Sequence, residues 1–548
     1  MSEKATIDGK CYAKMLEGGA AVLEAHAQEI NDLNVFPIPD GDTGENMLLT
    51  IQGGTDIGEA DPDLAQSAKK ISDAMLLSAR GNSGVILSQF FDGITVGFGN
   101  AVEADVGALG KAFRAGVEHA YSAVIKPTEG TILTVVREAT DYACSVGAKT
   151  PQEFLNAFIE EAKASLDRTP ELLPVLKKAG VVDSGGAGLI YIIDGMKRAL
   201  SGEKFDLAEK RGEKVAELDL DAFGVDSVLE FGYCTELLIR LQNAKVNIES
   251  FDINIIIKYL EEIGGDSIVA IKNGSIVKLH VHTMTPHKVL CFCQQFGEFL
   301  KVKIENMSLQ HNNLNEDAPA APKKPRERKP VGVVAVANGQ GIKQAFLDMG
   351  ADVIVEGGQS MNPSAEDFLR AFDEVCADTV LVFPNNSNIL LAAKQAAALY
   401  TDSDVRVLES RTIGDGYAAL SMLDTDLGDV DAMVDDCNMA MDGVVTAEIS
   451  RCVRHAEFGD VCVDDGDYIG FVGKEILAAE GGRYASAIGT VDKMAIADHD
   501  VCILICGEDS TEDEAMRIDE YIRNKYPRTE LYTINGGQSV YSYIIVAE

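Results

Sequence analysis

Small and aliphatic residues recur at helical spacing through roughly the first 200 residues, and alternating β-branched residues are scarce there. Clusters of Gly, Asp, Ser and Asn separate the apolar segments. The pattern predicts successive helices at 9–31, 63–77, 85–98, 106–124, 131–146 and 151–164. We therefore expect an all-α bundle or barrel over 1–202, with its polar loops gathered at the helix ends.

The pattern changes after a charged stretch at 201–226, which indicates a domain boundary. Strand signals at 231–239 and 275–283 mix with helix signals at 251–263 and 286–296. This mixture predicts an α+β middle domain over 222–311. The Pro-rich and polar stretch 312–330, with basic residues at 323–329, is interpreted as a linker.

A continuous apolar run at 331–337 is typical of a strand that is buried on both faces. Helical and strand patterns then alternate up to residue 408, which predicts parallel βαβ units. Further strands are expected at 444–449, 468–472, 501–505, 530–533 and 541–546. The segment 331–548 is therefore predicted to be α/β, and the pattern leaves open whether it forms one domain or two.

The charge balance narrows the possible partners. The 548 residues contain 48 Lys and Arg against 87 Asp and Glu, a formal net charge of -39, and no Trp. Such a field repels nucleic-acid phosphates and anionic lipids, so we expect neither as a main partner. If the chain binds a nucleotide, metal ions are expected to supply the positive charge.

Nothing in the sequence indicates export or membrane insertion. The first residues, MSEKATIDGK, lack the basic and apolar regions of a signal peptide, and no apolar stretch is long enough to cross a bilayer. The 11 Cys are scattered, which suits reduced thiols. We expect a cytoplasmic protein without stable membrane insertion.

The densest motif is NVFPIPDGDTGENM at 34–47. Two Pro and two Gly argue against regular helix up to Gly44, so a helix is expected to begin near Asn46. Asp40 and Asp42 can then point the same way across a tight turn, and hard carboxylate oxygens at that spacing suit Mg²⁺. An Asx-type turn that caps the helix is the alternative.

Three further Gly-rich motifs stand at helix entrances. ARGNSG at 79–84 offers backbone N–H groups exposed by Gly81 and Gly84, joined by the Ser83 hydroxyl, and so suits an anion; a plain turn with Ser83 as N-cap is the alternative. GVVDSGGAG at 180–188 and KPTEGT at 126–131 carry the same two interpretations. A bundle can gather all four entrances at one end.

In their order along the chain, at 34–47, 79–84, 126–131 and 180–188, the four motifs resemble the nucleotide-binding domain of the L subunit of dihydroxyacetone kinase. The whole layout resembles the ATP-binding A subunit of bacterial fatty acid kinase, and EGGQSMNP at 356–363, FPNNSNI at 383–389 and GGQSVYSYII at 536–545 are similar to its C-terminal part. The resemblance implies ATP, two Mg²⁺ ions and a transfer of phosphate.

The resemblance also implies roles for individual residues. It makes Asp40 and Asp42 the catalytic carboxylates that hold Mg²⁺, with the amide Asn34 at the position of a third acidic ligand. Residues implied to bind the nucleotide are Thr43, Asn46, Gly81, Asn82, Ser83, Gly84, Thr131, Asp183 and Gly185.

A separate metal site is predicted in the middle domain. Strand alternation places His280 and His282 on one face, and Cys234 in the preceding strand would complete a set of Zn²⁺ ligands. A pair of surface histidines with a buried Cys is the alternative. The fatty acid kinase resemblance favours zinc at these positions.

The leading hypothesis is a kinase subunit that phosphorylates the carboxylate of a fatty acid. A separate fatty-acid-binding carrier would present the acid, the product would be an acyl phosphate, the C-terminal domain would dock the carrier, and the chain would form a homodimer. Two alternatives remain: a kinase for dihydroxyacetone or another small ketone, and a nucleotide- and metal-binding regulatory scaffold without turnover.

Overall fold

The computed structural model describes residues 5–34, 41–124, 126–205, 233–242, 245–246, 248, 251, 253–263, 266–273, 276–306, 328–359, 361–425, 428–452, 456–458 and 461–548. The chain divides into two units. One unit contains 1–207 together with 327–548, and the other contains 208–326. The predicted fold class, with an all-α N-terminal part followed by α+β and α/β parts, is confirmed.

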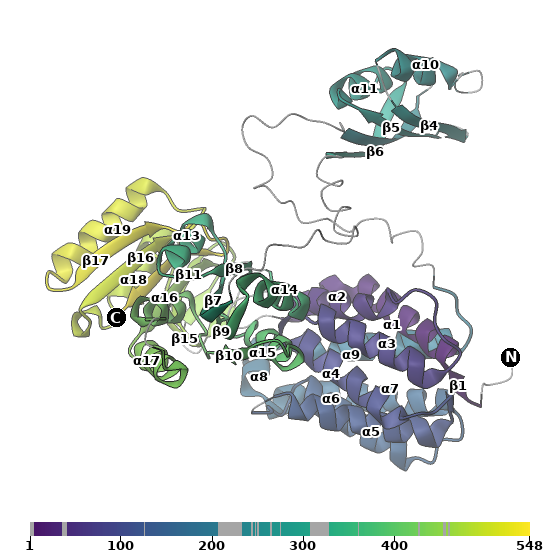
Figure 1. Cartoon of the computed structure of the whole chain (residues 1–548), viewed down its shortest axis with the longest axis horizontal. Helices are drawn as coiled ribbons and strands as arrows, with labels where there is room; N and C mark the ends of the chain where they lie inside the picture. Colours follow the sequence, from purple (N-terminus) through teal and green to yellow (C-terminus); the bar gives the residue numbers. More distant parts are fainter. Residues whose placement is uncertain are drawn as a thin grey trace. The chain divides into compact units, whose positions relative to one another are not determined.

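The N-terminal part is a bundle of helices around one apolar core (Figure 1). Its elements are β1 (Ile7–Asp8), α1 (Gly9–Leu33), α2 (Thr43–Thr55), α3 (Leu64–Ser78), α4 (Gly81–Phe98), β2 (Glu103–Ala104), α5 (Val106–Ser122), α6 (Ile132–Ser145), α7 (Pro151–Leu172), α8 (Pro174–Ala179) and α9 (Ser184–Leu200). Phe113 joins α5 to α7 through edge-on ring contacts with Phe154 and Phe158. Most of these helices bury one apolar face in this core.

Two helices of this bundle differ from the sequence prediction. Helix α2 begins at Thr43, not near Asn46, because Gly44 serves close packing here and does not break the helix. A Cβ at Gly44 would lie 2.2 Å from the carbonyl oxygen of Ala27. Helix α7 continues eight residues past the predicted end at 164, to Leu172, although it contains Pro170. The Thr169 hydroxyl donates to the carbonyl of Leu166 (2.7 Å), which the missing N–H of Pro170 would otherwise leave unpaired.

The middle unit contains an antiparallel sheet of strand order β4-β5-β3-β6 with two helices. Its elements are β3 (Tyr233–Leu241), α10 (Asn254–Glu262), β4 (Asp266–Asn273), β5 (Ile276–Thr283), α11 (Pro286–Cys293) and β6 (Gly297–Asn306). Leu237, Leu279 and Val281 lie in its apolar core with residues of both helices.

The C-terminal part begins with a parallel sheet of strand order β10-β9-β7-β8. Its elements are β7 (Lys329–Ala337), α13 (Gln340–Asp348), β8 (Val353–Glu356), α14 (Ala365–Val375), β9 (Ala377–Phe383), α15 (Leu390–Leu399), β10 (Asp404–Val407), α16 (Ile413–Met422) and α17 (Val430–Asp442). The strand order reverses at β7: β8 lies on one side of it, and β9 and β10 lie on the other. Such a reversal leaves a crevice at the carboxyl ends of the strands.

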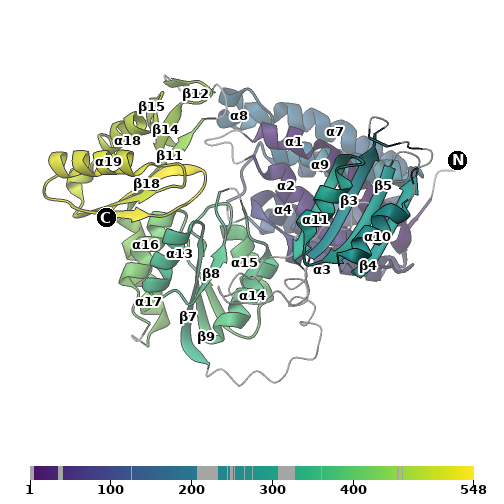
Figure 2. The same ribbon diagram turned by 90° about the horizontal axis from the view of Figure 1, so that it is seen from above.

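A second, mixed sheet has the strand order β15-β14-β11-β18-β16-β17. The elements of this region are β11 (Val445–Arg451), β12 (Ala456–Phe458), β13 (Val461–Val463), β14 (Tyr468–Val472), β15 (Glu475–Glu480), α18 (Arg483–Val491), a 3₁₀ turn (Ile496–Asp498), β16 (Val501–Cys506), α19 (Glu512–Lys525), β17 (Glu530–Asn535) and β18 (Tyr541–Ala547). Helices α13, α16 and α17 lie between the two sheets and share one core with them, whereas α18 and α19 pack against the second sheet (Figure 2).

Candidate functional site

The entrance of α2 is built around Asp42. This residue occupies the position before the first helical residue and is 9% exposed, yet its side chain makes no capping hydrogen bond to the helix. Asp42 therefore does not cap α2 with its side chain. Its carboxylate Oδ2 instead accepts a hydrogen bond from the side-chain amide of Asn362, in the loop between β8 and α14.

The entrance of α9 lies beside that of α2. The Ser184 hydroxyl donates to the Thr43 hydroxyl across 3.3 Å, which joins the first and third motifs. Asp183 caps α9 by accepting from the Gly186 N–H (2.7 Å), and it also accepts a hydrogen bond from the Ile132 N–H at the start of α6. The third and fourth motifs are therefore joined as well.

Helix α4 begins at Gly81 and approaches α2 closely. Gly81 has φ +57°, and a Cβ there would lie 2.6 Å from Nδ2 of Asn46. A Cβ at Gly84 would lie 2.4 Å from the hydroxyl oxygen of Thr50. Only glycine permits this approach, and it brings the N–H groups at the start of α4 next to the first turn of α2. Since α4 starts at Gly81, Ser83 lies in its first turn and is not the N-cap.

At the entrance of α6, apolar packing matters more than the polar side chains do. Thr131 stands at the N-cap position without capping the helix, and its hydroxyl donates to the carbonyl of Thr128 in its own turn (2.8 Å). The next residue, Ile132, lies against Gly185, where a Cβ would come within 3.2 Å of the Ile132 Cβ. Thr131 is therefore next in sequence to a residue that packs against the start of α9, and its own hydroxyl is hydrogen-bonded within its turn.

The raised pKa of Asp183, at the start of α9, favours a positively charged group beside its carboxyl. Removal of this carboxyl from water raises its pKa to about 6, against the lowering effect of the hydrogen bonds from Gly186 and Ile132. A buried carboxylate that is costly to ionise by itself is easier to ionise beside positive charge.

The other two predicted Mg²⁺ ligands, Asp40 and Asn34, stay predictions. Asp40 lies outside the described residues, so its pairing with Asp42 stays a prediction. Asn34 stands at the C-terminal end of α1, where its backbone N–H donates to the carbonyl of Asn31 (3.0 Å). The amide oxygen of Asn31 accepts from the Gly44 N–H (2.7 Å), so Asn31 links α1 to the start of α2, a contact that the motif pattern did not indicate.

The C-terminal part also reaches this site, which sequence reasoning missed. Besides the contact of Asn362 with Asp42, Nδ2 of Asn82 donates to Oδ1 of Asn388 (3.2 Å). Asn362 and Asn388 belong to EGGQSMNP and FPNNSNI, two motifs that carry the family resemblance but predicted no chemical role. No local pattern could have paired them with residues some 300 positions away.

Together these contacts form a polar site at the entrances of α2, α4 and α9, with α6 alongside. Helix N-termini bind anions through their free N–H groups, and the carboxylate of Asp42 provides hard oxygen for a cation. The amide oxygens of Asn82 and Asn362 are buried without a hydrogen-bond partner in the described part of the chain. Such oxygens fit a site that receives a cation or a donor. We name this set the helix-entrance site; it comprises Asp42, Thr43, Asn46, Gly81, Asn82, Asp183, Ser184 and Asn362.

In the middle unit, the pairing of strands β3 and β5 shows which residues lie opposite the predicted zinc ligands. Cys234 on β3 is the register partner of His282 on β5, and Glu236 is that of His280. The side chains of Cys234, His280 and His282 lie outside what the structure describes, so zinc stays a prediction. Within the described residues, no group of three or more His, Cys, Asp or Glu side chains is placed to hold a metal ion.

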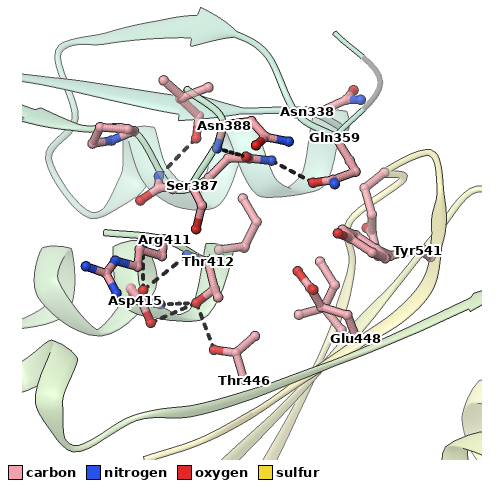
Figure 3. Close-up of a pocket in the computed structure, with 18 of the residues that line it drawn as sticks. Asn338, Gln359, Ser387, Asn388, Arg411, Thr412, Asp415, Thr446, Glu448 and Tyr541 are labelled. Carbon is pink, nitrogen blue, oxygen red and sulfur yellow. Dashed lines mark hydrogen bonds between the residues drawn. The ribbon is translucent and has the colours of Figure 1, made fainter. Parts of the chain in front are cut away.

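A separate cavity of about 640 Å³ lies in the C-terminal part, where residues following all four parallel strands face the second sheet (Figure 3). Asn338 follows β7, Gln359 follows β8 and Asn388 follows β9, while Thr412 and Asp415 form a capping box at the start of α16. We name it the strand-end cavity. Because the ends of parallel strands meet at one edge, this crevice is the expected ligand position of the fold.

Glu448 lines the strand-end cavity from the second sheet, near Tyr541 (Figure 3). Its register partners on the neighbouring strands are Phe471 and Ile544, so its immediate surroundings are apolar. This burial raises the pKa of Glu448 to about 7, against a lowering hydrogen bond with Tyr541.

Comparison with known proteins identifies the family. Models of the middle and C-terminal domains of the fatty acid kinase A-subunit-like family match residues 230–314 and 332–548, and a DAK2 domain model matches 37–198. Protein YloV of Bacillus subtilis is 38% identical over 99% of both chains, and the uncharacterized protein SAR1202 of Staphylococcus aureus is 35% identical over the same shares.

Two solved structures are similar to parts of the chain. The dihydroxyacetone kinase from C. freundii, in complex with AMP-PNP and Mg²⁺, has 20% identity and a TM-score of 0.28 over 36% of each chain. A DegV family protein from Thermus thermophilus has 14% identity and a TM-score of 0.30 over 40% of this chain and 99% of its own. Neither likeness carries the assignment, which rests on the family models and the full-length relatives.

Among the described residues, no helix combines the length and apolar character needed to span a membrane. The helix entrances of the DAK2 region, together with the matches along nearly the whole length, lead to one conclusion: this chain is a member of the fatty acid kinase A-subunit-like family, a kinase subunit with an N-terminal DAK2 domain.

Proposed function

We propose that this chain uses Mg²⁺ and ATP to phosphorylate the carboxylate of a fatty acid held by a separate fatty-acid-binding carrier protein, giving an acyl phosphate. One observation carries the proposal: Asp42, the Thr43–Ser184 pair and Asp183 come together at the entrances of α2 and α9, in the DAK2 domain of a chain of the fatty acid kinase A-subunit-like family.

The residues of the helix-entrance site fit a metal-bound triphosphate. The N–H groups at the starts of α2, α4 and α9 would bind phosphate oxygens, and the hydroxyls of Thr43 and Ser184 would donate to them. Asp42, with Asp40 as predicted, would hold Mg²⁺. When bound, Mg²⁺ supplies positive charge that neutralises the phosphate oxygens, which suits a chain with a net charge of -39.

In the proposed reaction, a carboxylate oxygen of the fatty acid forms a bond to the γ-phosphorus of ATP. The bond between that phosphorus and the β–γ bridging oxygen breaks, and ADP leaves with the electron pair. No proton needs to be removed from the attacking carboxylate, so the chain's task is to position the reactants and to exclude water. Asp183 holds the starts of α6 and α9 together through its two accepted hydrogen bonds and so shapes one wall of the site.

Two parts of the proposal, the docking of the fatty acid carrier and the homodimer, rest on the family assignment alone. The carrier would dock on the C-terminal part, and the chain would act as a homodimer. Both belong to the same proposal and are tested separately from the reaction.

The experiment measures ADP formation by the full chain with Mg²⁺ and ATP in three mixtures: fatty acid plus purified carrier, dihydroxyacetone, and no acceptor. We expect turnover only in the first mixture, with the acyl phosphate trapped by hydroxylamine as a hydroxamate. Turnover with dihydroxyacetone alone would identify a small-ketone kinase. Nucleotide binding without turnover in any mixture would indicate a regulatory scaffold.

A further inference from the structure

Two loops of the C-terminal part reach into the helix-entrance site. The loop between β8 and α14 brings Asn362, which donates its side-chain N–H to the Asp42 carboxylate; these residues are 4% and 9% exposed. The loop after β9 brings Asn388, whose Oδ1 accepts from Asn82 at the start of α4. The site is therefore made from two parts of the chain that fold around separate cores.

Arg80 fixes the position of the first loop. Its Nη1 donates to the backbone carbonyl of Asn362 (3.0 Å), and its backbone forms an antiparallel bridge with Ser364. Its Nη2 also lies 3.8 Å from the carboxylate of Asp367, in the first turn of α14. These contacts immediately flank Asn362, so its side chain has little freedom to leave Asp42.

Apolar packing holds the two parts together independently of these polar contacts. Ala79 and Val85, at either side of the α4 entrance, are buried in a core whose other members come from the C-terminal part, among them Phe368 and Phe372. A change at Asn362 therefore removes a polar contact without removing the apolar contact that holds the interface. This separation makes the role of Asn362 testable.

The hydrogen-bonding state of the site points to a ligand. Oδ1 of Asn362 and Oδ1 of Asn82 are both buried without a partner in the described part of the chain, and both amides already donate through Nδ2. Two buried acceptors beside a buried carboxylate complement a cation or a donor group, since buried polar atoms are nearly always paired.

We propose that Asn362 is a positioning residue of the nucleotide site: its amide fixes the Asp42 carboxylate, so the C-terminal part completes the site that binds Mg²⁺ and nucleotide. This inference rests on the proposed function and deepens it. It gives the motif at 356–363 a role, and it makes nucleotide affinity depend on a residue 320 positions from Asp42.

The test measures equilibrium binding of a non-hydrolysable ATP analogue to the full chain by calorimetry, over a range of Mg²⁺ concentrations. Asn362→Ala removes the donor, and Asn362→Asp keeps the shape but places a like charge against Asp42. We expect each to weaken Mg²⁺-dependent binding by about 10-fold, the scale of a hydrogen bond to a charged group. Met361→Ala changes a half-exposed neighbour in the same loop and is expected to bind as the parent does.

A double-mutant cycle separates positioning from general structure. If Asn362 acts through Asp42, then Asn362→Ala should weaken binding further by less than twofold in an Asp42→Asn background. Equal losses in both backgrounds would overturn the inference, as would unchanged or tighter binding by Asn362→Ala. If the parent chain needs no Mg²⁺ to bind the analogue, or if Asp42→Asn binds normally, the proposed function itself fails.

Discussion

The helix-entrance site and the strand-end cavity are both polar, but they are built from opposite chemistry. The first gathers helix N-termini, whose free N–H groups favour anions, around the carboxyl groups of Asp42 and Asp183. The second gathers amides and hydroxyls at the ends of parallel strands and places Glu448 among apolar neighbours. The difference is that helix N-termini, which favour anions, stand together in the DAK2 domain, whereas the cavity holds a carboxyl group whose ionisation is costly.

The two sites also differ in how their residues are grouped along the sequence. Each of the four N-terminal motifs is a short helix entrance, so packing of the bundle only has to bring compact units together. The strand-end cavity draws on residues from Val336 to Ile544, and no short segment carries most of it. The first kind of site is visible in a sequence, and the second is not.

The strongest test of the comparison removes charge from the helix-entrance site. We expect Asp42→Asn to lower the rate of ATP-dependent phosphorylation by about 1,000-fold or more, because a ligand of the cation is lost where charge must be neutralised. The rate is measured with fatty acid and carrier in excess. Glu45→Gln, an exposed change in the first turn of the same helix, should leave the rate within about twofold of the parent.

The second test concerns the close approach of α4. Gly81→Ala should weaken nucleotide binding by about 10-fold, because the new methyl group displaces Asn46 and the N–H groups at the start of α4. Gly99→Ala is the matched control, since Gly99 ends the same helix with φ +56° and has open space around it. Both changes should lower the free energy of unfolding by about 1–3 kcal/mol through backbone strain, and only the first should alter binding by calorimetry. Equal binding by the two variants would contradict the role given to this approach.

The third test concerns the carboxyl of the strand-end cavity. Since the pKa of Glu448 is raised to about 7 in the folded chain, the folded state holds this proton more tightly than the unfolded state. Its contribution to stability is therefore full below about pH 4.5 and is lost as the pH rises towards 7. Glu448→Gln should be on the order of 2 kcal/mol more stable than the parent at pH 8 and should lose this advantage near pH 4.5.

Denaturant unfolding at several pH values measures this effect. Glu475→Gln, an exposed change on the same sheet, serves as the control. A pH-independent difference between parent and Glu448→Gln would show that the carboxyl is not held away from water. Asp183 contributes a trend of the same sign at lower pH, and it is present in both proteins.

The smallest expected effect is a loss of stability at the start of α16, in the wall of the strand-end cavity. Thr412→Val removes the capping box at the start of α16, where the Thr412 hydroxyl and the Asp415 carboxylate satisfy each other's backbone N–H groups. We expect a loss of about 1 kcal/mol in the free energy of unfolding and no change in nucleotide affinity. Thr401→Val, in the exposed turn before β10, should change neither quantity. A loss of nucleotide affinity in Thr412→Val would show that the two sites are coupled.

The sequence predicted elements better than their ends. The apolar run at 331–337 predicted the central strand β7, since a strand that is covered on both faces has apolar residues at successive positions. The start of α2 was misplaced by three residues and the end of α7 by eight. In both places a tertiary or side-chain contact overrides a local preference: Gly44 packs against Ala27, and Thr169 replaces the donor that Pro170 lacks.

The sequence by itself determined the classes of fold and the chemistry of the helix entrances, because helical periodicity, glycine and acidic residues act over a few neighbouring positions. Only the tertiary structure decided that Asn31, Asn362 and Asn388 stand beside these entrances and that Asp42 faces an amide and does not cap its own helix. An asparagine carries no signal of its partner, since its hydrogen bonds are set by whichever backbone or side chain the packing of distant apolar cores brings within reach.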